Sequence, residues 1–282
     1  MNIGTRSLAV VVGAAVALVT AGCGGDSGGG GAGGAAENQS ITIGIKYDQP
    51  GLGQKEGDTF KGLDVDVAKY VAKELGYEGD KVVFKETPSA QRETAIQGGQ
   101  VSLIFATYSI TDERKQKVSF AGPYFIAGQD LLVRSDNTDI TGPDTMNGKT
   151  LCSVTGSTPA ENIKKKYATS VKLFEQDTYS KCVEALVGGS VDAVTTDNVI
   201  LAGFAAQPQY EGKLKVVGKP FSTEKYGVGL KKGDTATCEK VNAALQKMVS
   251  DGSWQKAIDD NVGPSGFKVD TKTNPPKPEP CS

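Results

Sequence analysis

Three short segments carry polar groups of the kinds that bind a charged small molecule. The segment ATYSITDERK contains Ser109 and Arg114, and a guanidinium can hold a carboxylate through two parallel hydrogen bonds. The segment GSTP places Ser157 and Thr158 before a proline suited to the first turn of a helix, where backbone N–H groups attract anions. The segment TTDN offers Asp197 as a partner for an ammonium. Together they match an α-amino acid zwitterion, because buried charges must be paired.

Each of these groups also has a purely structural interpretation. Arg114 is compatible with a surface arginine in a first helical turn, Ser157 with a plain helix N-cap, and Asp197 with a cap of the helix that follows it. Arg92 is likewise compatible with a solvated helix residue. The structural interpretations remain open until the positions of these side chains are known.

Composition excludes several classes of protein. The chain has 282 residues, with 31 Lys and Arg against 33 Asp and Glu, and no histidine, which excludes Ser-His-Asp triads and histidine metal sites. A formal net charge of −2 argues against an electrostatic nucleic-acid binder. The sequence has no GxxxxGK[ST] loop, so any ATP must be used by a separate subunit. No metal or cofactor is expected. Only four of the cations are arginine, and Arg134 has no evident role.

The N-terminus has the parts of an export signal. Residues 1–22 combine Arg6 with an apolar stretch too short to span a membrane and with small residues before Cys23. The run VTAGC resembles a bacterial lipobox, although Thr20 stands where leucine is usual. We therefore predict a lipoprotein signal peptide, a lipid on Cys23, a Gly/Ser-rich tether over 23–40 and attachment to the outer face of the cell membrane. An ordinary signal peptide beside an unmodified thiol is the alternative.

Strands and helices alternate twice in the same βαβαβ order. The segments AIQGGQV and ALVGGSV, which begin at Ala95 and Ala185, occupy equivalent places in the two sets, each as a helix end, a Gly-Gly turn and a strand start. This match predicts two similar lobes. The expected strands are 41–47, 81–86 and 101–105 in the first set and 150–154, 171–175 and 191–195 in the second, and the expected helices are 63–75, 90–97, 159–167 and 180–187.

Two further apolar runs set the expected lobe boundaries. Residues 130–134 and 226–231 are predicted to be strands that cross between the lobes and return the chain to the first one for a helix over 235–250 and a short helix at Trp254. This assigns 41–130 and 226–268 to lobe 1, 131–225 to lobe 2, and 269–282 to an extended proline-rich tail. In open α/β sheets ligands collect at the carboxyl ends of strands, so the site is expected in the cleft between the lobes.

Four cysteines remain after Cys23, and an even number agrees with export. They allow three pairings. The two-lobe arrangement favours Cys152 with Cys182 and Cys238 with Cys281, because each pair then lies within one lobe. Four buried reduced thiols are the alternative.

The motifs resemble a known family. GLDVDVAKYVAKEL, ATYSITDER, GSTPAENI, CVEAL and VDAVTTDN occur in the order found in family 3 of the extracellular solute-binding proteins, which bind polar amino acids for ABC importers. The likeness covers roughly residues 41 to 265. The phrases KYDQPGLG, PSAQRE and LCSV are most similar to the glutamate-binding lipoproteins of Gram-positive bacteria. The resemblance implies a two-lobe, type II periplasmic-binding-protein-like α/β fold and a monomeric, non-catalytic receptor that delivers L-glutamate to a permease with separate ATPase subunits.

The resemblance also implies a set of ligand contacts. They are Ser109 and Arg114 with Ser157 and Thr158 at the α-carboxylate, Asp197 and the Thr107 carbonyl at the ammonium, Arg92 and Ser89 at the side-chain carboxylate, and Lys46 and Tyr179 where some relatives have arginine and histidine. Three cations (Lys46, Arg92 and Arg114) against one carboxylate favour an acidic ligand. Aspartate, glutamine or asparagine as ligand, a dehydratase or lyase on the same scaffold, and a surface lipoprotein without a small ligand are the alternatives.

Overall fold

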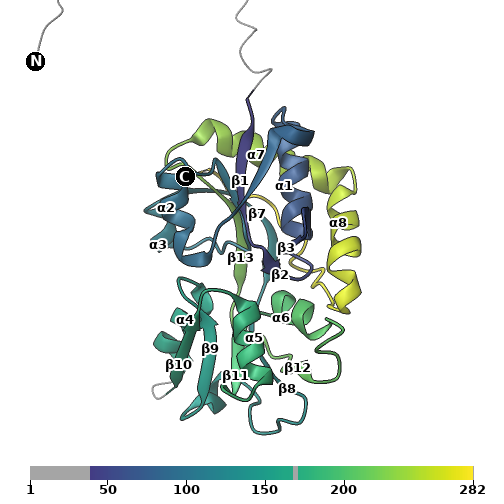
Figure 1. Ribbon diagram of the computed structural model, residues 1–282. Helices are drawn as coiled ribbons and strands as arrows, with labels where there is room; N and C mark the ends of the chain where they lie inside the picture. The colour runs from purple at the N-terminus through teal and green to yellow at the C-terminus, as the bar shows by residue number, and fades with distance from the viewer. Residues whose placement is uncertain (1–38, 168–170, 282) are drawn as a thin grey trace, which may run out of the picture. The chain divides into compact units, whose positions relative to one another are not determined.

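The computed structural model describes residues 39–167 and 171–281 (Figure 1). The predicted signal peptide and the predicted lipidation at Cys23 lie outside these residues. Within them, no helix has both the length and the apolar character needed to cross a membrane. The described residues belong to one compact unit.

A first five-stranded sheet has the order β5-β1-β6-β13-β7. Its strands are β1 (Ile41–Ile45), β5 (Val82–Glu86), β6 (Leu103–Phe105), β7 (Ser119–Ala127) and β13 (Glu224–Leu230). The first three are parallel to one another, whereas β13 runs antiparallel to β6 and to β7. Helices α1 (Leu63–Glu74), α7 (Thr235–Ser250) and α8 (Ser253–Asn261) contact one another beside this sheet. Two shorter helices, α2 (Arg92–Gln97) and α3 (Asp112–Lys115), complete this half.

The second sheet repeats the first, with the order β10-β9-β11-β8-β12. Its strands are β8 (Gln129–Arg134), β9 (Thr150–Val154), β10 (Lys172–Gln176), β11 (Ala193–Asp197) and β12 (Leu214–Val216), and its helices are α4 (Thr158–Asn162), α5 (Tyr179–Val187) and α6 (Asn198–Ala205). Here too, three parallel strands are followed by an antiparallel strand. The two-lobe α/β fold predicted from the sequence is therefore confirmed (Figure 1).

The matched Gly-Gly segments are equivalent turns. In each pair the second glycine has a positive φ, 66° at Gly99 and 76° at Gly189, while the first does not. Each turn connects a helix, α2 or α5, to the third parallel strand of its sheet. The internal similarity seen in the sequence thus reflects the same backbone turn used twice.

The chain passes between the two sheets at residues just before the predicted crossing strands. Gly128 separates β7 from β8, and the return passage lies between β12 and β13. The two passages are adjacent, because Ala127 pairs with Glu224 and the Phe221 N–H donates to the Gln129 carbonyl. The predicted crossing segments 130–134 and 226–231 instead each lie in one sheet, where β8 and β13 both have two hydrogen-bonded neighbours.

Three strand regions were not expected from the sequence: β12 at the edge of the second sheet, β7, and a separate small sheet. β7 contains Gly122-Pro123, a pair that reads as a break, but it is an edge strand, where proline is tolerated. The three short strands β2 (Asp48–Gln49), β3 (Gly53–Glu56) and β4 (Thr59–Lys61) form a separate small sheet. The helix expected over 159–167 is α4 followed by a π-helical turn, Ile163–Tyr167, and four short 3₁₀ turns span Gly79–Lys81, Ser89–Gln91, Pro143–Met146 and Gly263–Ser265.

Disulfides join Cys152 to Cys182 and Cys238 to Cys281, the two pairs that the lobe assignment favours. The second disulfide ties the proline-rich tail to α7, and the tail also contacts β7. There the Asn274 side chain accepts a hydrogen bond from the Ile126 N–H at 2.8 Å and donates one to its carbonyl at 2.9 Å. The tail thereby covers part of the open edge of β7 and satisfies its backbone groups.

Arg134 acquires a structural explanation. Its Nη1 donates to the carbonyls of Leu186 and Val191, both at 3.0 Å, and so ties the end of α5 to the segment before β11. Cationic donors are favourable at the carbonyl end of a helix.

Candidate ligand-binding site

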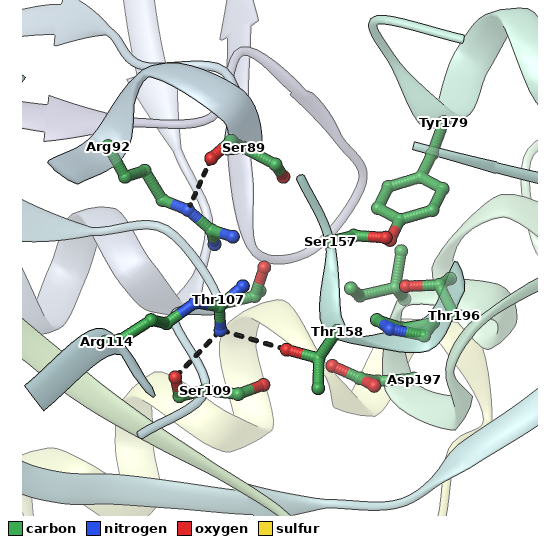
Figure 2. A pocket seen from close by; sticks show the side chains of 12 residues that line it. Ser89, Arg92, Thr107, Ser109, Arg114, Ser157, Thr158, Tyr179, Thr196 and Asp197 are labelled. Atoms are coloured by element: carbon green, nitrogen blue, oxygen red, sulfur yellow. Dashed lines mark hydrogen bonds between the residues drawn. The ribbon is translucent and has the colours of Figure 1, made fainter. Parts of the chain in front are cut away.

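A narrow polar pocket lies where the carboxyl ends of the two sets of parallel strands face each other. Nine of the ten predicted ligand residues line it, all except Lys46. In Figure 2, Ser89, Arg92, Ser109 and Arg114 face Tyr179, Ser157, Thr158 and Asp197. The nine lining residues that the sequence predicted are Ser89, Arg92, Thr107, Ser109, Arg114, Ser157, Thr158, Tyr179 and Asp197.

The topology explains why residues so far apart in sequence meet. Five of the six parallel strands are followed by a predicted residue within three positions of their ends. In the first lobe these are Lys46 after β1, Ser89 after β5 and Thr107 after β6. In the second lobe they are Ser157 after β9 and Tyr179 after β10. Asp197 is the last residue of β11. All six parallel strands therefore direct their carboxyl ends to one region, as expected for open α/β sheets.

Arg114 is held by both lobes. Its Nη1 donates to the Ser109 carbonyl at 2.8 Å and to the Thr158 hydroxyl at 2.9 Å (Figure 2). Its Nε also lies 3.4 Å from a Glu93 carboxylate oxygen. The side chain folds back from α3 rather than pointing to solvent, and only 8% of the residue is exposed. This placement does not fit the surface-arginine interpretation.

Arg92 is a buried cation with neutral partners. It donates to the carbonyls of Ser89, Ala106 and Gly156 at 3.2 to 3.3 Å, and its guanidinium lies 4.3 Å from the centre of the Tyr108 ring. Only 2% of the residue is exposed, so it is not a solvated helix residue. Burial, followed by the charge of Arg114, lowers its pKa to about 10, which leaves it charged at neutral pH. No carboxylate oxygen of the described residues lies within 4 Å of it.

Lys46 lies behind the pocket wall. Its ammonium donates to the Ser89 hydroxyl at 2.8 Å, and Ser89 in turn lines the pocket. The residue is 4% exposed, and burial, reinforced by Arg92, lowers its pKa to about 7. Lys46 therefore does not line the pocket, although it is one of the ligand contacts predicted from the sequence. It is a second buried basic group, about half protonated at pH 7, and lies one hydroxyl away from the pocket.

Asp197 provides the opposite charge. It is the N-cap of α6, yet its side chain makes no capping hydrogen bond to that helix; Oδ2 instead accepts from the Tyr226 hydroxyl at 2.6 Å. Its Oδ1 is buried and has no hydrogen-bond partner in the described part of the chain. Burial, together with the nearby Glu224 charge, raises its pKa to about 8. Such an acceptor is suited to a cationic donor placed in the pocket.

The remaining predicted residues surround these charges. Ser157 precedes α4, and its hydroxyl lies 3.3 Å from that of Ser153 rather than capping the helix. Tyr179 is 3% exposed, and burial, followed by the Asp197 charge, raises its pKa to about 12. It is therefore a neutral hydroxyl at neutral pH. Pro159, Thr196 and Ile200 also line the pocket and were not predicted, although Thr196 stands beside Asp197 in the TTDN segment.

The charge count from the sequence is incomplete. It omits Glu93, which pairs with Arg114, and Glu224, which is 4% exposed and close enough to raise the pKa of Asp197. It also omits buried Asp64, on which the charges of Lys46 and Arg92 act. The preference for an acidic ligand therefore cannot depend on the sum of the charges. It depends on their separation, with Arg92 and Lys46 in the first lobe and Asp197 facing them from the second.

A metal centre is not indicated in residues 39–167 and 171–281, where no group of three potential ligands occurs.

The family model of the bacterial extracellular solute-binding proteins, family 3, matches residues 41–270. The chain belongs to this family. Family 3 members are solute-binding proteins, and this chain is one of them rather than a dehydratase or lyase.

Several relatives of this family 3 protein have names that state a ligand. The "Glutamate-binding protein GluB" of Corynebacterium glutamicum is 48% identical over 95% of this chain and 94% of that protein. The "ABC transporter glutamine-binding protein GlnH" of Bacillus subtilis is 37% identical over 78% of this chain and 80% of that protein. Among solved structures, "An ancestral arginine-binding protein bound to glutamine" is 35% identical, with a TM-score of 0.74 over 80% of this chain and 99% of that one.

Proposed function

We propose that this protein is a lipid-anchored receptor of an ABC importer, which captures L-glutamate between its lobes and delivers it to a permease served by separate ATPase subunits. The proposal includes four features that the described residues do not show: the signal peptide, the lipid anchor on Cys23, the location on the outer face of the membrane and the monomeric state. The 48% identity to a glutamate-binding protein supports the ligand.

The unpartnered Oδ1 of Asp197 is the observation that carries the proposal. A buried carboxylate oxygen without a donor is unfavourable unless a ligand supplies one, and an α-ammonium does so. Arg114 then binds the α-carboxylate together with the Thr158 hydroxyl, which already accepts a hydrogen bond from Arg114. Arg92, with Lys46 behind Ser89, takes the side-chain carboxylate.

Glutamate is favoured over glutamine by the neutral partners of two buried cations. Arg92 donates only to backbone carbonyls and Lys46 to a hydroxyl within the described residues. Burying a cation is costly unless an anion compensates it, and a side-chain carboxylate compensates it better than an amide. Glutamine remains the principal alternative because one relative is named for it.

A calorimetric panel of glutamate, glutamine, aspartate and asparagine tests the proposal. Glutamate is expected to bind most tightly, and at 100 times its Kd to add about 2.7 kcal/mol to the free energy of unfolding. If none of the four amino acids binds, the receptor proposal is wrong. If glutamine binds more tightly than glutamate, the role of the two cations is wrong, while the receptor role stands.

Binding at pH 6 is expected to release about one proton from Asp197, because pairing with an ammonium favours the ionised carboxylate. Before binding, a pKa of about 8 leaves Asp197 mostly protonated at this pH, so affinity should rise as the pH increases from 6 to 7; above pH 7 the loss of charge on Lys46 opposes a further rise. Lys46, with a pKa of about 7, is already mostly protonated at pH 6 and therefore takes up only a small fraction of a proton on binding. Titrations in two buffers of different ionisation enthalpy measure the release; a value near zero would contradict the pairing.

Gly156 is expected to be essential for closing the lobes. Its carbonyl accepts from Arg92 at 3.3 Å and Arg114 at 3.1 Å, and a Cβ at this position would lie 2.7 Å from the Cα of Ala90. Gly156→Ala should therefore weaken ligand binding by about 30-fold or more, since backbone atoms of opposite lobes would collide. Calorimetry measures the affinity, and small-angle scattering measures closure.

Gly189→Ala is the matched control for that substitution. Gly189 has the same φ of 76°, but a Cβ there would meet no atom within 4 Å. Both variants therefore carry a similar backbone strain of roughly 1 kcal/mol or more, whereas only Gly156→Ala adds an interlobe collision. Equal affinities in the two variants would show that contact at Gly156 does not limit closure.

A further inference from the structure

Asp64 is a buried carboxylate outside the pocket that the proposed ligand contacts do not use. It is the second residue of α1 and has 0% of its surface exposed. Oδ2 accepts the Thr107 N–H at 3.0 Å, and Oδ1 accepts the Tyr124 hydroxyl at 2.6 Å. Both oxygens are thus engaged by donors. A carboxylate so deep in the first lobe requires an explanation, because burying it is costly.

Thr107 has an unusual backbone. Its φ of 45° makes it the only non-glycine residue with positive φ within the described ranges. Threonine is β-branched, so this conformation is strained and persists only where neighbouring contacts hold it. Thr107 also lines the pocket, directly after β6.

Contacts at both ends fix the peptide group between Ala106 and Thr107. The Ala106 carbonyl accepts from Arg92 at 3.2 Å, and the Thr107 N–H donates to Asp64. The Thr107 hydroxyl completes the turn by donating to the Ala106 carbonyl at 2.8 Å or to Gln49 Oε1 at 3.2 Å. This peptide group is therefore held at its oxygen by the Arg92 guanidinium and at its nitrogen by the Asp64 carboxylate.

The charge of Asp64 suits this role. Burial raises its pKa to about 6, while the two hydrogen bonds and the charges of Lys46 and Arg92 act in the opposite direction. The group is consequently ionised at pH 7.5. A hydrogen bond to a carboxylate is about twice as strong as one between neutral groups, which suits a contact that must maintain a strained residue.

We propose that Asp64 is a positioning residue, which holds the Thr107 main chain in the left-handed conformation and thereby directs the Thr107 carbonyl to the ligand ammonium. The inference rests on the proposed function for the ligand and adds a residue that touches no ligand. Asp64 and Arg92 then act on the ammonium end of the pocket through a single peptide group. Loss of Asp64 should weaken binding without removing any group that contacts the ligand.

Three single variants test this, with glutamate affinity by calorimetry at pH 7.5 and thermal unfolding as readouts. Asp64→Ala removes the acceptor and should weaken binding by about 10- to 100-fold. Asp64→Asn keeps a neutral acceptor for the Thr107 N–H and should lose about fivefold. Tyr124→Phe removes the other partner of the same carboxylate; it should lower the melting temperature but leave the affinity within about twofold. A ¹⁵N amide spectrum should show the Thr107 signal shifted in both Asp64 variants and nearly unchanged in Tyr124→Phe.

The order of affinities decides the outcome. The positioning role is supported if Tyr124→Phe matches the unmodified protein while Asp64→Asn and Asp64→Ala fall progressively below it. It is overturned if Asp64→Asn and Tyr124→Phe bind equally well, or if the affinities follow melting temperature alone. Should Asp64→Ala not fold, the comparison of Asp64→Asn with Tyr124→Phe still decides. Failure of the unmodified protein to bind any amino acid would instead refute the proposed function, and the ligand-directed part of this inference with it.

Discussion

Asp197→Asn is expected to weaken the binding of every α-amino acid by about 100- to 1,000-fold, because it leaves a buried ammonium without an opposite charge. Asparagine has nearly the same shape and can still accept from the Tyr226 hydroxyl, which donates to Oδ2 at 2.6 Å. The loss should therefore come from charge and not from repacking. Calorimetry with glutamate and glutamine measures it, and both ligands should lose affinity by similar factors because they share the α-ammonium.

Stability provides the control for this substitution. Burial raises the pKa of Asp197 from its ordinary value of 3.8 to about 8, so this group destabilises the folded protein progressively between those two pH values, and the destabilisation is complete above pH 8. At pH 8 to 9 the melting temperature of the unliganded Asp197→Asn variant should consequently be equal to or higher than that of the unmodified protein. A large fall in melting temperature, or a loss of glutamate affinity below tenfold, would contradict the assignment of Asp197 to the ammonium.

The sequence allows the parallel part of each sheet to be predicted because its signals are local. Alternating apolar residues, the Gly-Gly turns and the polar residues after each strand all lie within short windows, as at Thr107 and Asp197. Strand ends converge by topology alone, so once the βαβαβ order is recognised the meeting of distant residues follows. The same reasoning could not identify β7, since Gly122-Pro123 is a local break signal that only an edge position makes acceptable.

The balancing charges could not be predicted because they depend on long-range packing. Glu93 is one residue from Arg92 in sequence, yet its carboxylate pairs with Arg114 from another helix. Asp64 of α1 and Tyr226 of β13 lie outside the pocket and contact its residues Thr107 and Asp197, and nothing in their own segments indicates these partners. The sequence signal for Asp64 was present in the motif GLDVDVAKYVAKEL, but its amphipathic spacing accounts for the helix without giving that carboxylate a role.

The separation of charge across the pocket explains how one scaffold can select among similar amino acids. The groups proposed for the α-carboxylate and α-ammonium, Arg114 and Asp197, serve any amino acid. Selectivity must then come from the remaining cations, Arg92 and Lys46, which are buried beside Ser89. A substitution at the side-chain end, where Arg92 and Lys46 lie, should change the ratio of the glutamate and glutamine affinities. A substitution at Arg114 or Asp197 should change both affinities by the same factor.

Arg92→Met is accordingly expected to weaken glutamate by about 100-fold and glutamine by about tenfold or less, since only glutamate loses a charged partner. Some loss for both ligands is expected, because Arg92 also holds the Ala106 and Gly156 carbonyls. Methionine keeps an unbranched apolar chain beside the Tyr108 ring, which limits repacking. The ratio of the two dissociation constants, measured by calorimetry, therefore isolates the contribution of the charge.

Arg114→Met is the matched control, because it removes a second buried arginine that contacts the same Tyr108 ring and the same Gly156 carbonyl. Its loss should reduce both affinities by similar factors and leave their ratio unchanged, since the α-carboxylate is common to both ligands. Equal ratios in the two variants would place Arg92 at the shared end of the ligand. A changed ratio in Arg92→Met alone would identify Arg92 as the residue that distinguishes the acid from the amide.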